Sequence, residues 1–386
     1  MDSADVVVIG GGITGLCSGY WMAKRGLKVV VVEKGLIAWE ASGRNHGMMS
    51  PRGDEPREIP LAIEADRLWP MLDEELGHPT EWVAAGRLWA AMDEADWLRI
   101  QETGRRWAAV GVPIDVLDRR QLEDYLPGVS PRAPGGLYSP RGGHGNPHRT
   151  AQAFAWAMQT RGGRILQNTR VLSIVVTGGR VSAVETTAGT ISAPMVVSAA
   201  GPQTGHIGRM VGIDVPVAPA RVEAMLTTPL PPLFEEGLVM NGLALRQSLR
   251  GNLIIAGGPH EWTEVEADGQ PAKPSTLLMR DVARRLVEAF PATGEVPLLR
   301  AWAGIVELTP DKGILLDRLT TPIGIVVASA SGHGFGLCPS IGKAISELVI
   351  DGVSTVPIDG LNLARFGNLD PDWRASQGWK SGAYNT

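Results

Sequence analysis

The first 34 residues carry the pattern that most limits how this chain folds. An apolar run at residues 6–9 is followed by three closely spaced glycines, a segment of helical character at 14–25 and a second apolar run at 27–34. Gly26 separates the last two segments and is expected to end the helix. A strand, a glycine turn, a helix and a strand in this order form a βαβ unit. We therefore predict a parallel sheet with a right-handed crossover.

The glycines of this turn, and the acid near the end of the second run, point to a bound dinucleotide. Glycines at the first, third and sixth positions of the turn let the backbone approach a diphosphate at the start of the helix. Glu33 stands about 20 residues further on, where a carboxylate accepts hydrogen bonds from ribose hydroxyls. An acid there disfavours NADP but leaves NAD and FAD open, and a structural turn with chance spacing is the alternative. The residues assigned to the site are Gly10, Gly12, Ile13, Thr14, Gly15, Glu33 and Lys34.

Composition narrows the class of protein further. A chain of 386 residues exceeds what one hydrophobic core usually serves, so two domains are expected. The net charge of −5 and the lack of a long basic run argue against nucleic-acid binding. Cys17 and Cys338 are too distant in sequence to suggest a disulfide framework or a zinc site, so no metal is predicted. Because no apolar run reaches the ~18 residues of a membrane span and the N-terminus lacks signal-peptide features, we predict a cytoplasmic protein.

The segment after the βαβ unit changes character. Residues 51–130 are charged and rich in tryptophan. Within them Trp97, Ile100, Gly104 and Trp107 recur at the spacing of one helix face. We interpret this region as a helical insertion, in which the tryptophans form helical core rather than a substrate cage.

The second half of the chain predicts further strands. A helix at 146–163 precedes three apolar runs between residues 170 and 201, and glycine-containing turns join these runs into an antiparallel meander. Residues 216–270 alternate in short apolar pieces and predict a second sheet. The helix that follows is expected to be capped by Ser275.

Three segments have the small-residue content of ligand-binding loops. Residues 329–344, SASGHGFGLCPSIGKA, form a Gly-rich loop that opens a helix and directs the positive end of a second helix dipole at the ligand. A plain strand–helix connection is the alternative. Residues 41–50, ASGRNHGMMS, place polar side chains before two methionines, and residues 198–204, SAAGPQT, end a strand in small residues. These features suit a ligand that is polar at one end and flat and apolar at the other.

The order of four motifs along the whole chain resembles a known family. VVVIGGGITG, VVSAAG, RAWAGIVELTPDKGILL and SGHGFGLCPSIGKA occur in the order typical of D-amino-acid-oxidase-like FAD oxidoreductases. That family includes glycine oxidase, sarcosine oxidases and amino-acid dehydrogenase subunits. The segments VMNGLALRQSLRGNLIIAGG and WAGIVELTPD are most similar to β-subunit-like sarcosine oxidases and to opine and proline dehydrogenase subunits.

The resemblance implies an architecture and a reaction. The fold is α/β (α+β), with a Rossmann-like FAD-binding domain and an inserted antiparallel-sheet substrate domain. Residues 1–50, 146–215 and 299–386 would form the discontinuous FAD-binding domain, and residues 51–145 and 216–298 the substrate domain. The reaction would oxidise a C–N bond of an amine or amino acid, such as a secondary amine, opine or imino acid. Hydride would pass to flavin N5, giving an imine that hydrolyses, and oxygen or an electron-acceptor subunit of a hetero-oligomer would reoxidise the flavin.

The resemblance also assigns residues to the cofactor. Ser42, Arg44 and Asn45 would reach phosphate and ribityl oxygens, and Val171 would present its backbone to the adenine. The remaining positions would lie along the diphosphate, the ribose or the flavin ring. They are His46, Gly47, Met48, Ala200, Gly201, Trp302, Gly304, Gly332, His333, Gly334, Phe335 and Gly336.

Departures from the family pattern limit what is carried over. The region before TPD contains no cysteine, so FAD is expected to be bound non-covalently. Val306 stands where glycine oxidase has a carboxylate-binding arginine, which disfavours a simple α-amino-acid oxidase of that type. The candidates for binding a substrate carboxylate are therefore Arg246, Arg221, His260 and Arg52.

Two histidines are candidates for the chemistry. His46 and His333 lie in glycine-rich segments on the cofactor side, where either would tune the flavin or orient the amine. A structural histidine is the alternative for each. Three other functions stay open: a stand-alone D-amino-acid or glycine oxidase, a flavin-binding scaffold subunit without catalysis, and an NAD enzyme.

Overall fold

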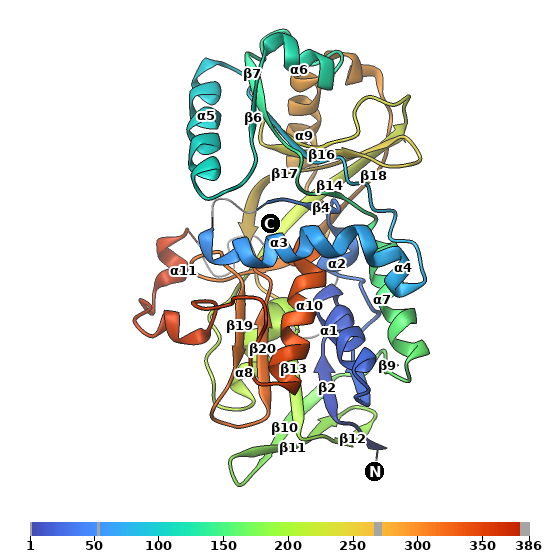
Figure 1. The fold of residues 1–386 in the computed structure, drawn as a ribbon, viewed down its shortest axis with the longest axis vertical. Helices are drawn as coiled ribbons and strands as arrows, with labels where there is room; N and C mark the ends of the chain where they lie inside the picture. The colour runs from blue at the N-terminus through green and yellow to red at the C-terminus, as the bar shows by residue number, and fades with distance from the viewer. Residues whose placement is uncertain (1, 52–54, 266–271, 379–386) are drawn as a thin grey trace.

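A computed structural model describes residues 2–51, 55–265 and 272–378 (Figure 1). Its helices and strands form a mixed α/β fold, as predicted. A six-stranded sheet and an eight-stranded sheet form its two main bodies, and a four-stranded sheet and a two-stranded pair accompany them. The α-helices are α1 (Ile13–Lys24), α2 (Ala41–Arg44), α3 (Ile59–Leu68), α4 (Leu72–Leu76), α5 (Glu94–Ala109), α6 (Arg119–Tyr125), α7 (Pro147–Thr160), α8 (Thr204–Arg209), α9 (Thr276–Ala289), α10 (Gly334–Ile350) and α11 (Trp373–Ser376).

The six-stranded sheet is built from distant parts of the chain. Its order is β19-β20-β13-β2-β3-β9, and every neighbouring pair is parallel except β19 with β20. Adjacent β2 and β3, joined through α1, confirm the predicted βαβ unit. Its strands are β2 (Val6–Ile9), β3 (Val29–Val32), β9 (Arg164–Leu166), β13 (Met195–Ser198), β19 (Leu315–Arg318) and β20 (Ile325–Ser329).

Both faces of this sheet are covered, which explains the continuous apolar runs of its strands. Val6 and Val8 of β2 pack in one core with α1, α7 and α10. Val7 and Ile9 point the other way, into a second core with the four-stranded sheet. The predicted end of α1 is confirmed, since Gly26 follows the C-cap residue with a φ of +88°.

The meander prediction is right for two runs and wrong for part of the third. Strands β10 (Val171–Thr177), β11 (Arg180–Thr186) and β12 (Gly189–Ser192) pair antiparallel, and β1 (Asp2–Ser3) adds to β12. The last apolar run, however, divides at Pro194. Proline lacks the N–H that a strand needs, so the chain breaks there. The rest of the run becomes β13 in the parallel sheet.

The eight-stranded sheet confirms the predicted second sheet and extends it. Its order is β18-β14-β17-β16-β15-β5-β7-β6. The helical interpretation of residues 51–130 was incomplete, because three of these strands lie in or just after that region. The sheet contains β5 (Arg87–Ala90), β6 (Asp115–Asp118), β7 (Gly135–Ser139), β14 (Ala218–Pro229), β15 (Gly237–Met240), β16 (Leu243–Gln247), β17 (Asn252–Trp262) and β18 (Leu298–Leu308).

The two faces of this sheet have different partners. Leu88, Leu238 and Leu245 pack in a core with α6 and α9. Ser275 caps α9 by accepting a hydrogen bond from Leu278 N, as predicted. The opposite face is turned toward β4 (Met48–Met49), which lies where the two main bodies meet (Figure 1) and pairs with β8 (Gly143–His144).

The edge strand β18 shows which of the two main sheets residues 298–308 belong to. It pairs with β14 over almost its whole length, so residues 298–308 belong to the eight-stranded sheet. The predicted FAD-binding segment 299–386 therefore begins in that sheet and enters the six-stranded sheet only at β19.

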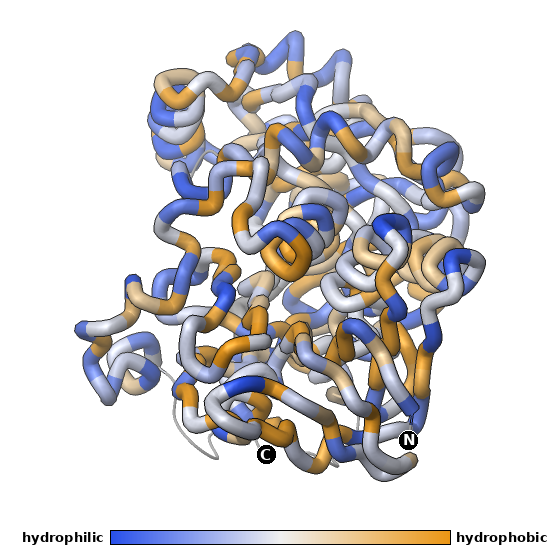
Figure 2. Tube along the Cα trace, turned by 60° about the horizontal axis from the view of Figure 1, so that its bottom comes forward, coloured by the Kyte–Doolittle hydropathy of each residue, from blue (hydrophilic) through white to orange (hydrophobic). Residues whose placement is uncertain are grey.

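Hydrophobic segments run through the middle of the molecule and hydrophilic ones mark the outer turns (Figure 2). None of the helices described is both long and apolar enough to cross a membrane.

Candidate functional site

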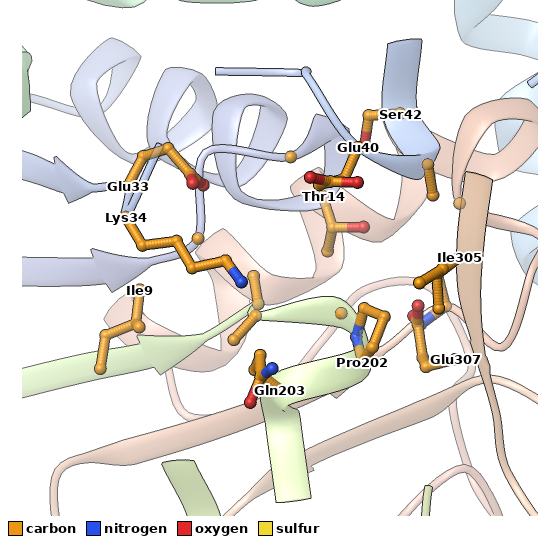
Figure 3. A pocket seen from close by; sticks show the side chains of 18 of the residues that line it. Ile9, Thr14, Glu33, Lys34, Glu40, Ser42, Pro202, Gln203, Ile305 and Glu307 are labelled. Carbon is orange, nitrogen blue, oxygen red and sulfur yellow. The ribbon is translucent and has the colours of Figure 1, made fainter. Parts of the chain in front are cut away.

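An elongated cavity of about 260 Å³ lies at the carboxyl ends of the parallel strands (Figure 3). Ile9 and Val32 end two of these strands and line the cavity, as do residues directly after β13 and at the end of β20. In parallel α/β sheets this edge is the usual place for a ligand. The sheet topology therefore brings the predicted loops to one place.

The glycine turn after β2 forms one wall and has no room for side chains. Gly10 has a φ of +109°, and an added Cβ would lie 2.3 Å from the carbonyl oxygen of Ala199. A Cβ on Gly15 would lie 2.0 Å from the carbonyl oxygen of Gly10, so this glycine keeps helix and strand close together. Gly12 is the N-cap of α1, and Ile13 and Thr14 line the cavity beside it. The start of this helix thus faces the cavity.

Glu33 is held rigidly at one end of the cavity. Its Oε2 accepts a hydrogen bond from Gly11 N at 2.7 Å, and its Oε1 accepts one from Gly35 N at 2.8 Å. Both carboxylate oxygens are therefore oriented by the turn itself. Lys34 and Val171 line the same end, and Figure 3 shows Glu33 and Lys34 opposite Ile305 and Glu307.

The segment at residues 41–50 contributes less directly than predicted. Ser42 and Asn45 line the cavity, but Ser42 Oγ accepts a hydrogen bond from Ile13 N at 2.8 Å. Asn45 braces its own loop by accepting from Gly47 N at 2.8 Å. Arg44 does not line the cavity, because its guanidinium donates to the carbonyl oxygens of Trp39 and Ala303.

His46, Gly47 and Met48 lie behind the cavity wall. They are absent from its lining, and Met48 pairs with His144 in the β4–β8 ladder. Gly47 has a φ of +78°, and an added Cβ would lie 2.2 Å from the carbonyl oxygen of Gly145. Burial lowers the pKa of His46 to about 3, with the positive charges of two nearby arginines adding to the effect. The imidazole is therefore neutral at physiological pH.

The Gly-rich loop before α10 forms the opposite wall. Gly332, Gly334 and Phe335 line the cavity, together with Ala200 and Gly201 from the loop after β13. The other two predicted residues of the α10 loop point elsewhere. The ring nitrogen Nδ1 of His333 lies 3.9 Å from Glu58 Oε2, and the carbonyl oxygen of Gly336 accepts a hydrogen bond from Trp69 Nε1 at 2.7 Å.

Strand β18 reaches the cavity with its last residues rather than with Trp302 and Gly304. Trp302 Nε1 donates to the carbonyl oxygen of Arg44 at 2.7 Å, and Gly304 leaves room for the Arg44 side chain. The lining is made instead by Ile305, Val306 and Glu307.

Glu307 is a buried carboxyl group that sequence reasoning missed. Its Oε1 accepts a hydrogen bond from Ala330 N at 3.0 Å and contacts Ser329 Oγ at 3.4 Å. Burial raises its pKa above the ordinary glutamate value. A single acid in the apolar run GIVEL was the available signal, since an acid is rarely buried in a strand without a reason. Further polar lining residues without such a signal are Glu40, Thr169, Arg170, Gln203, His206 and Glu264.

The four predicted carboxylate-binding residues are not brought together. Arg246 is buried and donates from Nε to the carbonyl oxygen of His46. Arg221 forms an ion pair with Glu261 and donates to the carbonyl oxygen of Lys273 at 3.2 Å. Arg52 and the side chain of His260 lie outside the described part of the structure.

The lining of the cavity fits a dinucleotide in its chemistry. This lining extends from Glu33, a carboxylate fixed by two backbone N–H groups, to Glu307, and it includes residues at the N-termini of α1 and α10, which favour negative charge. Positions 10 and 15 admit only glycine, as a backbone cradle for a diphosphate requires. Among the described residues, no group of three or more His, Cys, Asp or Glu side chains is placed to hold a metal ion. Fold and site thus define a dinucleotide-binding protein of the mixed α/β class.

Comparison with known proteins narrows this class to one family. The family described as DAO, FAD dependent oxidoreductase, matches residues 5–348. The chain belongs to this family: it is an FAD-dependent oxidoreductase, as the motif order predicted. FAD is therefore its cofactor, and the NAD alternative is excluded.

The similar relatives include one subunit of a larger enzyme and one glycine oxidase. The chain is 28% identical over 379 residues to sarcosine oxidase subunit beta of Rhodobacter capsulatus, covering 94% of this chain and 88% of the relative. It is also 28% identical over 363 residues to glycine oxidase of Geobacillus kaustophilus, covering 89% of this chain and 92% of the relative. Its fold is similar to the crystal structure of L-proline dehydrogenase from P. horikoshii, with a TM-score of 0.86 and 23% identity over 98% of this chain and 99% of that one.

Proposed function

We propose that this enzyme oxidises the C–N bond of an amino acid or N-alkyl amino acid and passes the electrons to an acceptor subunit. The observation that carries the proposal is the cavity at the carboxyl ends of the parallel strands, in a chain similar to sarcosine oxidase subunit beta. The neutral His46 lies behind the wall of this cavity. FAD, when bound, supplies the hydride acceptor. The protein supplies binding, orientation and exclusion of water.

We assign FAD to the cavity through its two ends. The Glu33 end would hold the adenosine part, the start of α1 would hold the diphosphate, and the loop before α10 would hold the isoalloxazine part. Non-covalent binding is supported by the positions of both cysteines. Cys17 Sγ donates to the carbonyl oxygen of Cys338 at 3.0 Å inside the α1–α10 core, and neither residue lines the cavity.

The division into domains that we propose follows the sheets. The FAD-binding part consists of residues 2–50, 146–215 and 309–378. The part that covers the substrate consists of residues 55–145, 216–265 and 272–308. The only shift from the sequence-based division is that β18 moves to the substrate side.

The neutral state of His46 suits the chemistry. An amine must lose its proton before it releases hydride, and a neutral imidazole neither repels a cationic substrate nor retains a competing proton. We assign His46 to positioning beside the reaction site. A His46→Ala variant tests this: the flavin spectrum and the rate of flavin reduction are expected to change. If both stay as in the wild type, His46 is structural. His333 is tested in the same way.

Anaerobic mixing with a panel of amines tests the proposed function. We expect sarcosine, N-substituted amino acids or cyclic imino acids to bleach the flavin absorbance. No bleaching with any of them would favour a non-catalytic scaffold. If a substrate is found, air is the second test. Rapid formation of hydrogen peroxide by the isolated chain would identify a stand-alone D-amino-acid or glycine oxidase and would contradict transfer to a partner subunit.

A further inference from the structure

Two buried arginines lie in one row across the eight-stranded sheet. Arg87 of β5 pairs with Gly237 of β15. Strands β15 and β16 pair antiparallel with Leu238 opposite Leu245, so continuing the register by one residue places Arg246 opposite Gly237. Residues paired in this way have side chains on the same face of a sheet. The two arginines therefore flank a glycine on the face opposite the leucine core.

The glycine between them makes room for the guanidinium groups. A Cβ on Gly237 would lie 2.5 Å from Arg87 Nη1 and 2.9 Å from Met48 Sδ. Arg87 is 3% exposed and Arg246 is 5% exposed. Side chains this large and this buried are almost always paired with an acid when they are charged.

No acid pairs with either arginine within residues 2–51, 55–265 and 272–378. Arg87 Nε is buried without a hydrogen-bond partner in that part of the chain, and Nη1 contacts the Met48 thioether. The guanidinium also lies over the Trp89 ring, with Cζ 5.6 Å from the ring centroid, but this contact supplies no negative charge. Arg246 uses Nε for the carbonyl oxygen of His46. Glu81 acts on Arg246 only from a distance, and its carboxylate already accepts from Asn146 and faces two other arginines.

The surrounding histidines add no further positive charge. His46 and His144 both have lowered pKa values, about 3 and about 4, chiefly because they are buried. The positive charges of Arg87 and Arg246 add to both shifts. Both imidazoles are neutral near pH 7, and His46 Nδ1 and His144 Nδ1 find no partner among the described residues. Within the described residues, the positive charges of Arg87 and Arg246 therefore have no acid partner.

The two cations lie next to the cofactor cavity but are separate from each other. Arg246 Nε contacts the backbone of His46, whereas Arg87 Nη1 contacts the Met48 thioether. Arg87 and Arg246 stand on β5 and β16, which are separated by β15, so their backbones lie about 10 Å apart and one carboxylate does not serve both groups well. Two contacts connect the segment 46–48 to the cofactor cavity. The carbonyl oxygen of Gly47 accepts a hydrogen bond from Gly145 N at 2.8 Å, and a Cβ on Gly145 would lie 3.5 Å from Phe335, which lines the cavity.

We propose that Arg87 and Arg246 form a two-cation site for two carboxylates of the substrate, so that the enzyme acts on amines that carry an acidic group on each side of the nitrogen. The proposal rests on the proposed function, because it names the substrate class of that same site. Arg87 is the residue added to the site; each guanidinium would bind one carboxylate through charge-assisted hydrogen bonds. An iminodicarboxylate of this kind places its C–N bond between the two anchors.

Binding of carboxylates that cannot be oxidised tests the site without turnover. Glutarate and butyrate have carbon chains of similar length and differ in one carboxylate. Their binding to the FAD-loaded enzyme is followed by the change in flavin absorbance and by calorimetry. We expect glutarate to bind at least about tenfold more tightly than butyrate. Equal affinities for the two ligands would overturn the proposal.

Variants separate the two anchors from a loss of folding. Arg87→Gln and Arg246→Lys are each expected to remove at least about tenfold of the glutarate affinity while leaving butyrate binding within about threefold. Arg284→Gln is the control, because this exposed arginine of α9 pairs with Asp281 and Glu288 away from the site. Should Arg87→Gln fail to fold, Arg246→Lys decides. Unchanged preference for glutarate in a folded variant would contradict the role of that arginine.

A matched pair of amines distinguishes failure of this inference from failure of the proposed function. Iminodiacetate and sarcosine are both N-substituted glycines, and only iminodiacetate carries a second carboxylate. Faster anaerobic flavin reduction by iminodiacetate supports the two-cation site. Equal or faster reduction by sarcosine would overturn it and leave the proposed function intact. If neither amine reduces the flavin but glutarate preference is present, the site stands and the proposed function fails.

Discussion

Replacing Glu33 by glutamine tests how the glycine turn is held in shape. The wild-type carboxylate accepts one hydrogen bond from Gly11 N and one from Gly35 N, at 2.7 and 2.8 Å. A glutamine side chain has one acceptor oxygen, so Glu33→Gln turns its NH₂ group toward one of the two N–H donors. A hydrogen bond to a charged group contributes about 1.5–3 kcal/mol. Because Glu33 is partly exposed, we expect a loss of about 1–2 kcal/mol in unfolding free energy.

Urea unfolding of the apoprotein measures this change, and fluorescence titration measures FAD binding. A looser turn also costs affinity, and 1–2 kcal/mol corresponds to about a five- to thirtyfold weaker FAD complex. Glu40→Gln is the matched control: this glutamate lines the same cavity, but it is exposed and makes no side-chain hydrogen bond within the described ranges. If Glu33→Gln unfolds at the same urea concentration as the wild type and Glu40→Gln, the carboxylate does not brace the turn.

Three further changes have expected outcomes. Gly10→Ala places a Cβ 2.3 Å from Ala199 O and should yield protein without FAD. Gly26 also has a positive φ but has open space around it, so Gly26→Ala should retain the yellow colour of bound FAD and lose only about 1–2 kcal/mol of stability in the same urea assay. Burial raises the pKa of Glu307 in the folded state, so the wild type should lose stability as the pH rises above 4.5, and Glu307→Gln should remove this loss. If the melting temperatures of both proteins change with pH in the same way, the reasoning is wrong. His144→Asn should flatten the wild-type loss of stability below pH 6.5, since the folded state resists protonation of this imidazole until pH about 4; an unchanged slope of melting temperature against pH would refute it.

The parts of the fold that follow local rules were predictable from the sequence. The βαβ unit, the cap at Ser275 and the end of α1 at Gly26 each depend on a few neighbouring residues. The split of the third apolar run at Pro194 follows from the missing N–H of proline, but the apolar residues on both sides of it conceal the change of sheet. Strand β5 contains RLWA in a region rich in helical patterns, and its pairing partner β15 lies some distance along the chain, so a single sequence offers no local sign of it.

In the candidate site, too, the residues fixed by local sequence were predictable and those fixed by contacts between distant segments were not. Gly10, Gly12 and Glu33 were found because their spacing is set by one turn. The side-chain directions of Arg44 and Trp302 were not, because each depends on contact between α2 and β18, which are about 260 residues apart in sequence. Arg87 was missed together with its strand. Burial, which gives Arg87 and Glu307 their chemical interest, is a property of the assembled sheets and not of the sequence near them.

The strand order of the six-stranded sheet has a consequence for how the protein is made. β2 lies between β3 and β13, and β13 is covered on its other edge only by β20. A ribosome therefore completes the glycine turn long before the strand and helix that close the cavity around it. Val6 and Val8 of β2 and Val29 and Val31 of β3 emerge while α10, with which they share a core, is still unsynthesised, so their apolar side chains stay incompletely covered until then. The wall formed by the loop before α10 exists only once Gly334 has been translated, so the complete cavity forms after most of the chain has been made.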